Sequence, residues 1–294
     1  MSTIYFITTQ DIDTFQKKLQ ETLFNAVTMP FPLLFDRRYA ALINTAYLKL
    51  TLPAECLTPE FYRYLRELSL HWQFDFFIKS QPLPANGIIA FDMDSTFIAE
   101  EGVDEIARAL GMSTQIAAIT QQAMEGKLDF NASFTRRIGM LKGTPKAVLN
   151  AVCDRMTLSP GLLTILPVIK AKGFKTAIIS GGLIFTQRLK ARYQLDYAFS
   201  NTVEIRDNVL TDNITLPIMN AANKKQTLVD LAARLNIATE NIIACGDGAN
   251  DLPMLEHAGT GIAWKAKPVV REKIHHQINY HGFELLLFLI EDEL

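Results

Sequence analysis

The sequence predicts an α/β protein with a Rossmann-like parallel-sheet core, a helical cap inserted into that core, and a small α+β module before it. Short apolar runs at residues 88–91, 176–179 and 241–245 each end in a polar cluster and are separated by helical segments. That pattern is typical of a parallel sheet covered on both faces. Residues before position 83 instead carry a strand-helix-strand-strand-helix-strand pattern, and 294 residues suffice for more than one core.

In the amino-terminal module, residues 3–8 and 74–78 are expected as strands, and residues 39–52 as one or two strands. Residues 11–25 have helical spacing through Phe15, Leu19 and Leu23, and residues 58–72 form a second expected helix. This order is similar to a ferredoxin-like or ACT-type regulatory module. Turn formers fill residues 79–87, so we place the domain boundary there, with domains at 1–82 and 83–294.

The cap is expected at about residues 100–155, between the first two strands of the core. Its helical character shows in the spacing of Val103, Ile106, Ala107 and Leu110. An insertion directly after the first site strand is positioned to act as a lid over the strand ends.

Composition excludes several classes of function. The chain has 29 basic and 31 acidic residues, a net charge of −2, which is no electrostatic footprint for nucleic acid or a membrane surface. It shows neither an export signal nor an uninterrupted apolar segment of about 20 residues. The three cysteines lack paired or metal-type spacing, so we expect a cytoplasmic protein with free thiols.

Polar clusters follow each of the three apolar runs. Asp92 and Asp94 leave the first strand, where one carboxylate could attack while the other handles protons. Ser180 and Gly181 leave the second, and glycines there let backbone N–H groups approach an anion. Alone, an Asp-x-Asp pair is more often a solvated turn or helix cap, and the glycine pair could be an ordinary strand-to-helix turn.

The third cluster, residues 246–251, offers Asp247, Asn250 and Asp251 to a hard cation, although a glycine turn capped by aspartate is an equal reading in isolation. Lys224 and Lys225 precede an expected helix at residues 226–234, and one of them could balance the charge of a phosphate, whereas a solvated lysine pair would be the ordinary explanation. The joint order of nucleophile, phosphate loop, lysine and metal acids makes chance coincidence improbable.

In this order of motifs the chain resembles the haloacid dehalogenase superfamily of aspartyl phosphatases, and within it the branch that acts on O-phosphoserine. The resemblance covers about residues 87–275. It rests on segments 91–96, 101–107, 123–130, 133–137, 246–255 and 266–268. It implies Mg²⁺-dependent hydrolysis of O-phosphoserine to serine and phosphate, the last step of serine biosynthesis.

By position, the resemblance implies that Asp92 attacks phosphorus and forms an aspartyl-phosphate. Asp94 would protonate the departing serine oxygen and then activate water. Mg²⁺ would be held by Asp92, the backbone carbonyl of Asp94 and Asp247, with Asp251 supporting these ligands.

For substrate binding, the resemblance implies that Glu101 takes the ammonium group of the substrate and Arg137 its carboxylate. An arginine can grip a carboxylate through two parallel hydrogen bonds, which favours an amino acid over a sugar. The remaining expected substrate contacts are Met124, Phe130, Ser180, the Gly181 amide, Lys224 and Asn250.

Two alternatives remain open. The enzyme could transfer the phosphoryl group to another alcohol, or hydrolyse a different small phosphomonoester. In a different class of function, the chain would be a binding protein whose amino-terminal module senses an amino acid and whose phosphatase site is vestigial. That module could also hold two copies together as a homodimer.

Overall fold

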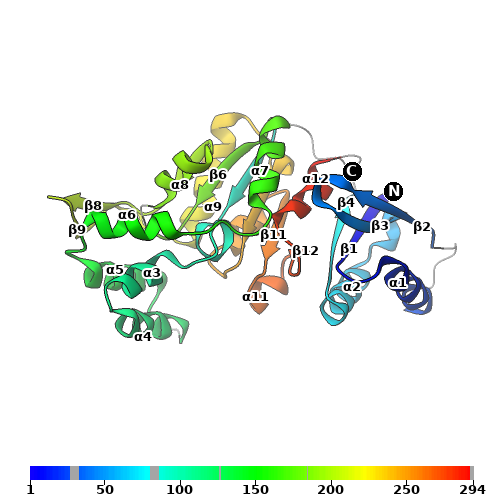
Figure 1. Cartoon of the computed structure of the whole chain (residues 1–294), viewed down its shortest axis with the longest axis horizontal. Coiled ribbons are helices and arrows are strands. Elements are labelled where there is room, and N and C mark those ends of the chain that lie inside the picture. Colours follow the sequence, from blue (N-terminus) through cyan, green and yellow to red (C-terminus); the bar gives the residue numbers. More distant parts are fainter. Residues whose placement is uncertain (27–32, 80–85, 126, 184, 292–294) are drawn as a thin grey trace.

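A computed structural model describes residues 1–26, 33–79, 86–125, 127–183 and 185–291, and the expected domain boundary at 82/83 lies outside them. Within these residues one ten-stranded sheet runs through the whole molecule in the order β2-β3-β1-β4-β12-β11-β10-β5-β6-β7 (Figure 1). The first four strands are antiparallel and the remaining six are parallel. The two parts join where β12 pairs with β4, Gln277 opposite Phe76.

The amino-terminal part has the predicted order of elements. Its bounds are β1 Ser2–Thr8, α1 Ile12–Ala26, β2 Phe35–Ala40, β3 Thr45–Leu52, α2 Pro59–Trp72 and β4 Phe74–Lys79. The region expected as one or two strands is a hairpin that begins four residues earlier than predicted and turns at Asn44, whose φ of 52° is left-handed. Thr58 caps α2 by accepting a hydrogen bond from the Phe61 amide at 3.2 Å. Phe15 and Leu65 of the two helices are fully buried against one face of the sheet.

The opposite face of this antiparallel sheet packs against the carboxyl-terminal end of the described chain. The Phe288 ring lies 5.3 Å from that of Tyr5 and 4.9 Å from that of Tyr47. Asp75 of β4 accepts backbone hydrogen bonds from Asn279 at 2.7 Å and from His281 at 3.0 Å. The module and the core are therefore joined by buried aromatic packing as well as by the shared sheet.

In the core, parallel strands alternate with helices as predicted. The strands are β5 Ile88–Phe91, β6 Lys175–Ile179, β7 Tyr197–Phe199, β10 Ile242–Gly246, β11 Thr260–Trp264 and β12 His276–Ile278. The helices are α7 Leu162–Ala171, α8 Phe185–Tyr193, α9 Ala221–Leu235, α10 Leu252–His257, α11 Pro268–Arg271 and α12 Leu287–Ile290. Helix α9 begins earlier than the predicted helix because Asn220 caps it, accepting from the Asn223 amide at 3.1 Å. Each helix in the described ranges is too short or too polar to span a bilayer.

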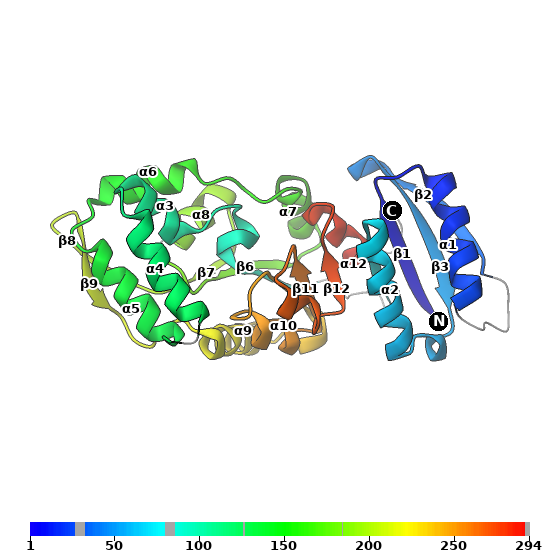
Figure 2. The same cartoon turned by 90° about the horizontal axis from the view of Figure 1, so that it is seen from below.

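The inserted segment is helical, as predicted, and lies over one end of the parallel strands (Figure 2). Its helices are α3 Gly102–Ala109, α4 Ser113–Met124, α5 Phe130–Leu141 and α6 Lys146–Arg155. The two segments that enter and leave it are tied together, since the Ala99 amide donates to the Thr157 carbonyl at 3.0 Å. A hairpin from the core, β8 Val203–Arg206 and β9 Val209–Ile214, also holds the cap, because the Gly143 amide donates to the Leu210 carbonyl at 2.8 Å.

Candidate active site

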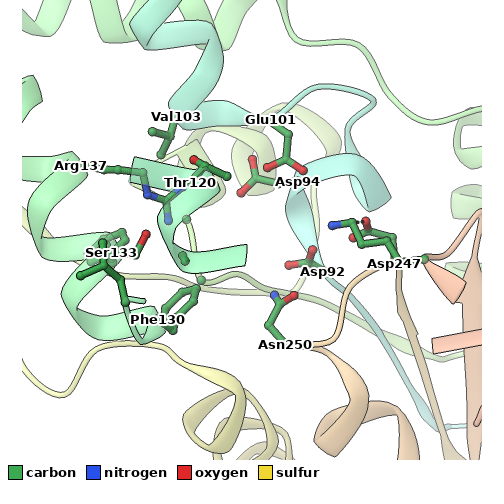
Figure 3. A pocket seen from close by; sticks show the side chains of 16 residues that line it. Asp92, Asp94, Glu101, Val103, Thr120, Phe130, Ser133, Arg137, Asp247 and Asn250 are labelled. Carbon is green, nitrogen blue, oxygen red and sulfur yellow. Dashed lines mark ion pairs between the residues drawn. The ribbon is translucent and has the colours of Figure 1, made fainter. Parts of the chain in front are cut away.

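The three polar clusters meet because they leave neighbouring parallel strands at the same edge of the sheet. Strand β5 lies between β6 and β10, with Phe91 opposite both Ile178 and Cys245. The Asp92 amide donates to the Cys245 carbonyl at 2.9 Å, which continues the ladder one residue past the strand. Clusters that are far apart in sequence thus face one cavity beneath the cap (Figure 3).

A buried lysine links the first and third clusters. Lys224 Nζ lies 2.5 Å from Asp92 Oδ1 and 2.6 Å from Asp251 Oδ1, and its side chain is completely buried. Burial alone would lower the pKa of Lys224, but Asp251 and Asp92 hold it above its ordinary value. Burial, reinforced by Asp251, raises the pKa of Asp92, and Lys224 opposes that rise. The short contact with Lys224 Nζ fixes the orientation of the Asp92 carboxylate.

The donor set beside Asp92 suits a hard divalent cation. One carboxylate oxygen from each of Asp92, Asp247 and Asp251 lies within 4.8 Å of the other two. Burial raises the pKa of Asp247, because removal from water disfavours its negative charge. Lys267 Nζ, 3.4 Å from Asp247 Oδ2, offsets only part of that charge. Carboxylate oxygens are the ligands that Mg²⁺ and Ca²⁺ take in proteins, so these residues fit a divalent metal.

Asp94 is held apart from this cluster by two glycines. The Gly102 amide donates to Asp94 Oδ1 at 2.7 Å, and a Cβ on Gly182 would lie 2.5 Å from Asp94 Oδ2. A side chain at position 182 would therefore displace the carboxyl group. Burial, reinforced by the charge of Glu101, raises the pKa of Asp94 to about 7. This pKa lets Asp94 carry a proton near neutral pH, as a general acid must.

The cap supplies the far wall of a cavity of about 370 Å³. Arg137 of α5 points into it, while its Nε atom is buried with no hydrogen-bond partner among the described residues (Figure 3). Burial lowers the pKa of Arg137, against the opposing charges of Asp104, Asp94 and Glu101. Desolvation raises the pKa of Glu101, whose Oε1 accepts from Ser95 Oγ at 2.8 Å. A half-buried guanidinium with an unpaired, buried Nε donor is suited to bind an anionic ligand group.

Most of the predicted site residues line this cavity. They are Asp92, Asp94, Glu101, Phe130, Arg137, Gly181, Asp247 and Asn250. Ser180, Lys224 and Asp251 lie behind its wall and are fully buried, with Ser180 Oγ accepting from the Gly182 amide at 2.9 Å. Met124 is at the end of α4, but its side chain lies outside the described part of the structure.

Sequence reasoning missed several lining residues. They are Val103, Thr120, Ala123, Leu128, Ser133, Phe134, Gly182 and Lys267. Six of them lie in segments that carried the family resemblance, although no role was assigned to them: Val103, Ala123, Leu128, Ser133, Phe134 and Lys267. Gly182 follows Gly181 in the loop after β6, and Thr120 comes from cap helix α4. Apolar spacing in the cap helices predicts burial but cannot say which cavity a side chain faces.

Comparison with known proteins agrees with this geometry. Residues 87–259 match the model of the haloacid dehalogenase-like hydrolase family. The phosphoserine phosphatase of Haemophilus influenzae is 41% identical over 212 residues, which cover 72% of this chain and 68% of that protein. The matched segment spans 50% to 68% of the length of four curated phosphoserine phosphatases.

Solved structures extend the likeness to the whole chain. A haloacid dehalogenase family hydrolase from Salmonella enterica serovar Typhi superposes with a TM-score of 0.96 at 95% identity, covering all of both chains. A probable phosphoserine phosphatase from Vibrio cholerae superposes with a TM-score of 0.77 at 32% identity, covering 98% of this chain and 86% of that one.

The chain therefore belongs to the haloacid dehalogenase-like hydrolase family. Within that family, its curated relatives at about 40% identity are phosphoserine phosphatases.

Proposed function

We propose that this protein is a phosphoserine phosphatase that hydrolyses O-phosphoserine through a phosphoryl group on Asp92. One observation supports it above the others: the cavity has the Asp92 cluster at one end, Arg137 with its unpaired Nε at the other, and the Glu101 carboxylate beside Asp94 (Figure 3). A phosphate ester that also carries a carboxylate and an ammonium group complements both ends.

Asp92 is the proposed nucleophile because its carboxylate is preset and cannot rotate freely. Lys224 holds one oxygen at 2.5 Å, and the Asp92 amide is tied to β10. Phosphoryl transfer asks a protein mainly for alignment and charge neutralisation, so a fixed carboxylate beside a buried lysine meets that need. Gly181 and Gly182 line the same space, where the phosphate oxygens would lie.

Asp94 is the proposed acid and base. Its pKa of about 7 means that a protonated form is available to the serine oxygen that leaves when the Asp92–phosphorus bond forms. The resulting carboxylate can then take a proton from the water that attacks phosphorus and releases Asp92. The hydrogen bond from the Gly102 amide keeps Asp94 in place for both steps.

We propose Mg²⁺ as the resident metal, held by Asp92, Asp247 and the Asp94 carbonyl. When bound it would offset the negative charge that otherwise separates a carboxylate nucleophile from a phosphate dianion. Asp251, which accepts from Lys224 and from the Gly248 amide at 3.0 Å, would orient these groups from behind.

Release of inorganic phosphate from O-phosphoserine with Mg²⁺ present tests the proposal directly. Asp92→Asn should abolish turnover, whereas Asp230→Asn, an exposed carboxylate on α9 that bonds Gln226, should leave the rate unchanged. Full activity of Asp92→Asn would exclude Asp92 as the nucleophile. Added alcohols in the same assay measure transfer against hydrolysis. A cytoplasmic location and a homodimer remain predictions.

A further inference from the structure

A second cavity lies where the amino-terminal module meets the core. It measures about 350 Å³ and is lined from α2 by Arg63, Arg66, Glu67 and Leu70, and from α11 and β12 by Pro268, Arg271, Glu272 and Gln277. Helices α2 and α11 lie on the same side of the joined sheet (Figure 1). None of these residues takes part in the proposed phosphatase chemistry.

The arginines of this cavity differ in what they contact. Arg66 bridges the two parts of the protein, because its Nη1 donates to the backbone carbonyls of Arg271 at 3.1 Å and Glu272 at 3.0 Å. Arg63 and Arg271, in contrast, form no ion pair with a carboxylate among the residues that the structure describes. Two guanidinium groups from different parts of the protein thus border one cavity, and neither forms a short ion pair among the described residues.

The floor of the cavity is fixed. Gln277 is 7% exposed, and its Nε2 donates to the carbonyls of Arg271 at 2.8 Å and Ile274 at 3.0 Å. Gln277 is also the β12 residue that pairs with Phe76 of β4. The backbone that carries Arg271 is therefore held at the sheet junction, and a ligand would meet it already in place.

We propose that this cavity binds a small oxyanion, a carboxylate or phosphate, between Arg63 and Arg271. Guanidinium groups present paired N–H donors that match the oxygens of both anions. Three arginines against two glutamates leave the lining with an excess positive charge. Leu70 and Pro268 add apolar surface for a short carbon chain.

The site also has a short connection to the active site. Helix α11 starts one residue after Lys267, whose amide donates to the Asp247 carbonyl at 3.0 Å and whose Nζ lies 3.4 Å from Asp247 Oδ2. The amide of Arg271 in turn donates to the Lys267 carbonyl at 3.1 Å. An anion on Arg271 therefore acts on the same helical turn that carries Lys267 to the active-site cavity.

Calorimetric titration of the full chain with malonate, and separately with inorganic phosphate, in metal-free buffer tests the site. Arg271→Ala and Arg63→Ala should each weaken binding about tenfold or more, as expected for a lost hydrogen bond to a charged group. Lys273→Ala, which removes an exposed cation outside the lining, should bind like the wild type, and Arg137→Ala reports separately on any binding of the probes in the active site. Thermal unfolding of each variant confirms that it folds.

The two probes separate the ligand classes. Saturable binding of malonate alone identifies a carboxylate site, and saturable binding of phosphate alone identifies a phosphate site, provided that either is lost in Arg271→Ala. Absence of saturable binding of both probes at millimolar concentration would overturn the proposal. So would binding that is unchanged in Arg271→Ala, because the probes would then occupy another part of the protein such as the active site.

Discussion

Replacing Arg137 with alanine should change substrate choice more than it changes catalysis. Its guanidinium lines the active-site cavity, and its buried Nε has no partner among the described residues. A bound carboxylate would accept two parallel hydrogen bonds from it, and a hydrogen bond to a charged group contributes about 1.5–3 kcal/mol. We take about 3–4 kcal/mol for the pair, since water already screens part of this half-buried side chain.

That energy predicts a loss of about 10²–10³-fold in kcat/KM for O-phosphoserine. O-phosphoethanolamine keeps the ammonium and phosphate groups but lacks the carboxylate, so its kcat/KM should change by no more than about threefold. Phosphate release from both compounds, measured in parallel with Mg²⁺, gives the two ratios. The matched control is Arg136→Ala, which removes an exposed arginine of the same helix that bonds Gln122 at 3.1 Å.

An equal loss on both substrates would refute the reasoning. Arg137 would then support the cap or the charge of Asp94, and the carboxylate would be recognised elsewhere. A loss confined to O-phosphoserine, with Arg136→Ala unchanged, assigns carboxylate recognition to Arg137.

Three further perturbations follow from the geometry. Because burial raises the pKa of Asp94 to about 7, the protonated acid becomes scarce as the pH rises through 7, so kcat/KM should fall on that side. Asp94→Asn should lose about 10²–10⁴-fold below pH 7 and should lack this decline. Lys224→Met leaves two buried carboxylates without their cation and should destabilise the metal-free protein by about 3–5 kcal/mol. The Tm should fall, and added Mg²⁺ should partly restore it. An unchanged Tm would contradict the buried ion pairs of Lys224. Glu100 accepts hydrogen bonds from the Thr157 amide at 3.0 Å and the Thr157 hydroxyl at 2.7 Å. Glu100→Ala should therefore speed amide hydrogen exchange in the two segments that enter and leave the cap. Unaltered exchange would mean that backbone hydrogen bonds alone hold these two segments together.

Local order in the sequence was enough to predict most elements. Strands β5, β6 and β10 are continuous apolar runs, and α2 has a threonine cap with buried positions one helical turn apart, so each is specified by its own neighbours. The polar clusters could be grouped from their positions along the chain because parallel strands deliver their carboxyl ends to one edge of a sheet. Asp92, Asp94, Asp247 and Asn250 were found in that way, and all four line the cavity.

Other features depend on contacts between distant segments. The pairing of β12 with β4 involves Gln277 and Phe76, and no periodic pattern in either segment indicates that one sheet crosses both parts of the chain. Lys267 is a second example. It lies between β11 and α11, and it contacts Asp247 because β11 lies beside β10 in the sheet. Hydrophobic spacing determines which face of an element is buried, whereas its neighbour is chosen by the packing of the whole molecule. The sequence by itself thus determined the amino-terminal elements, the strands β5, β6 and β10, the helical cap and the polar loops that follow those strands. The tertiary structure decided the shared sheet, the cavity beneath the cap and the arginine-lined junction, because these form between segments that are far apart in the chain.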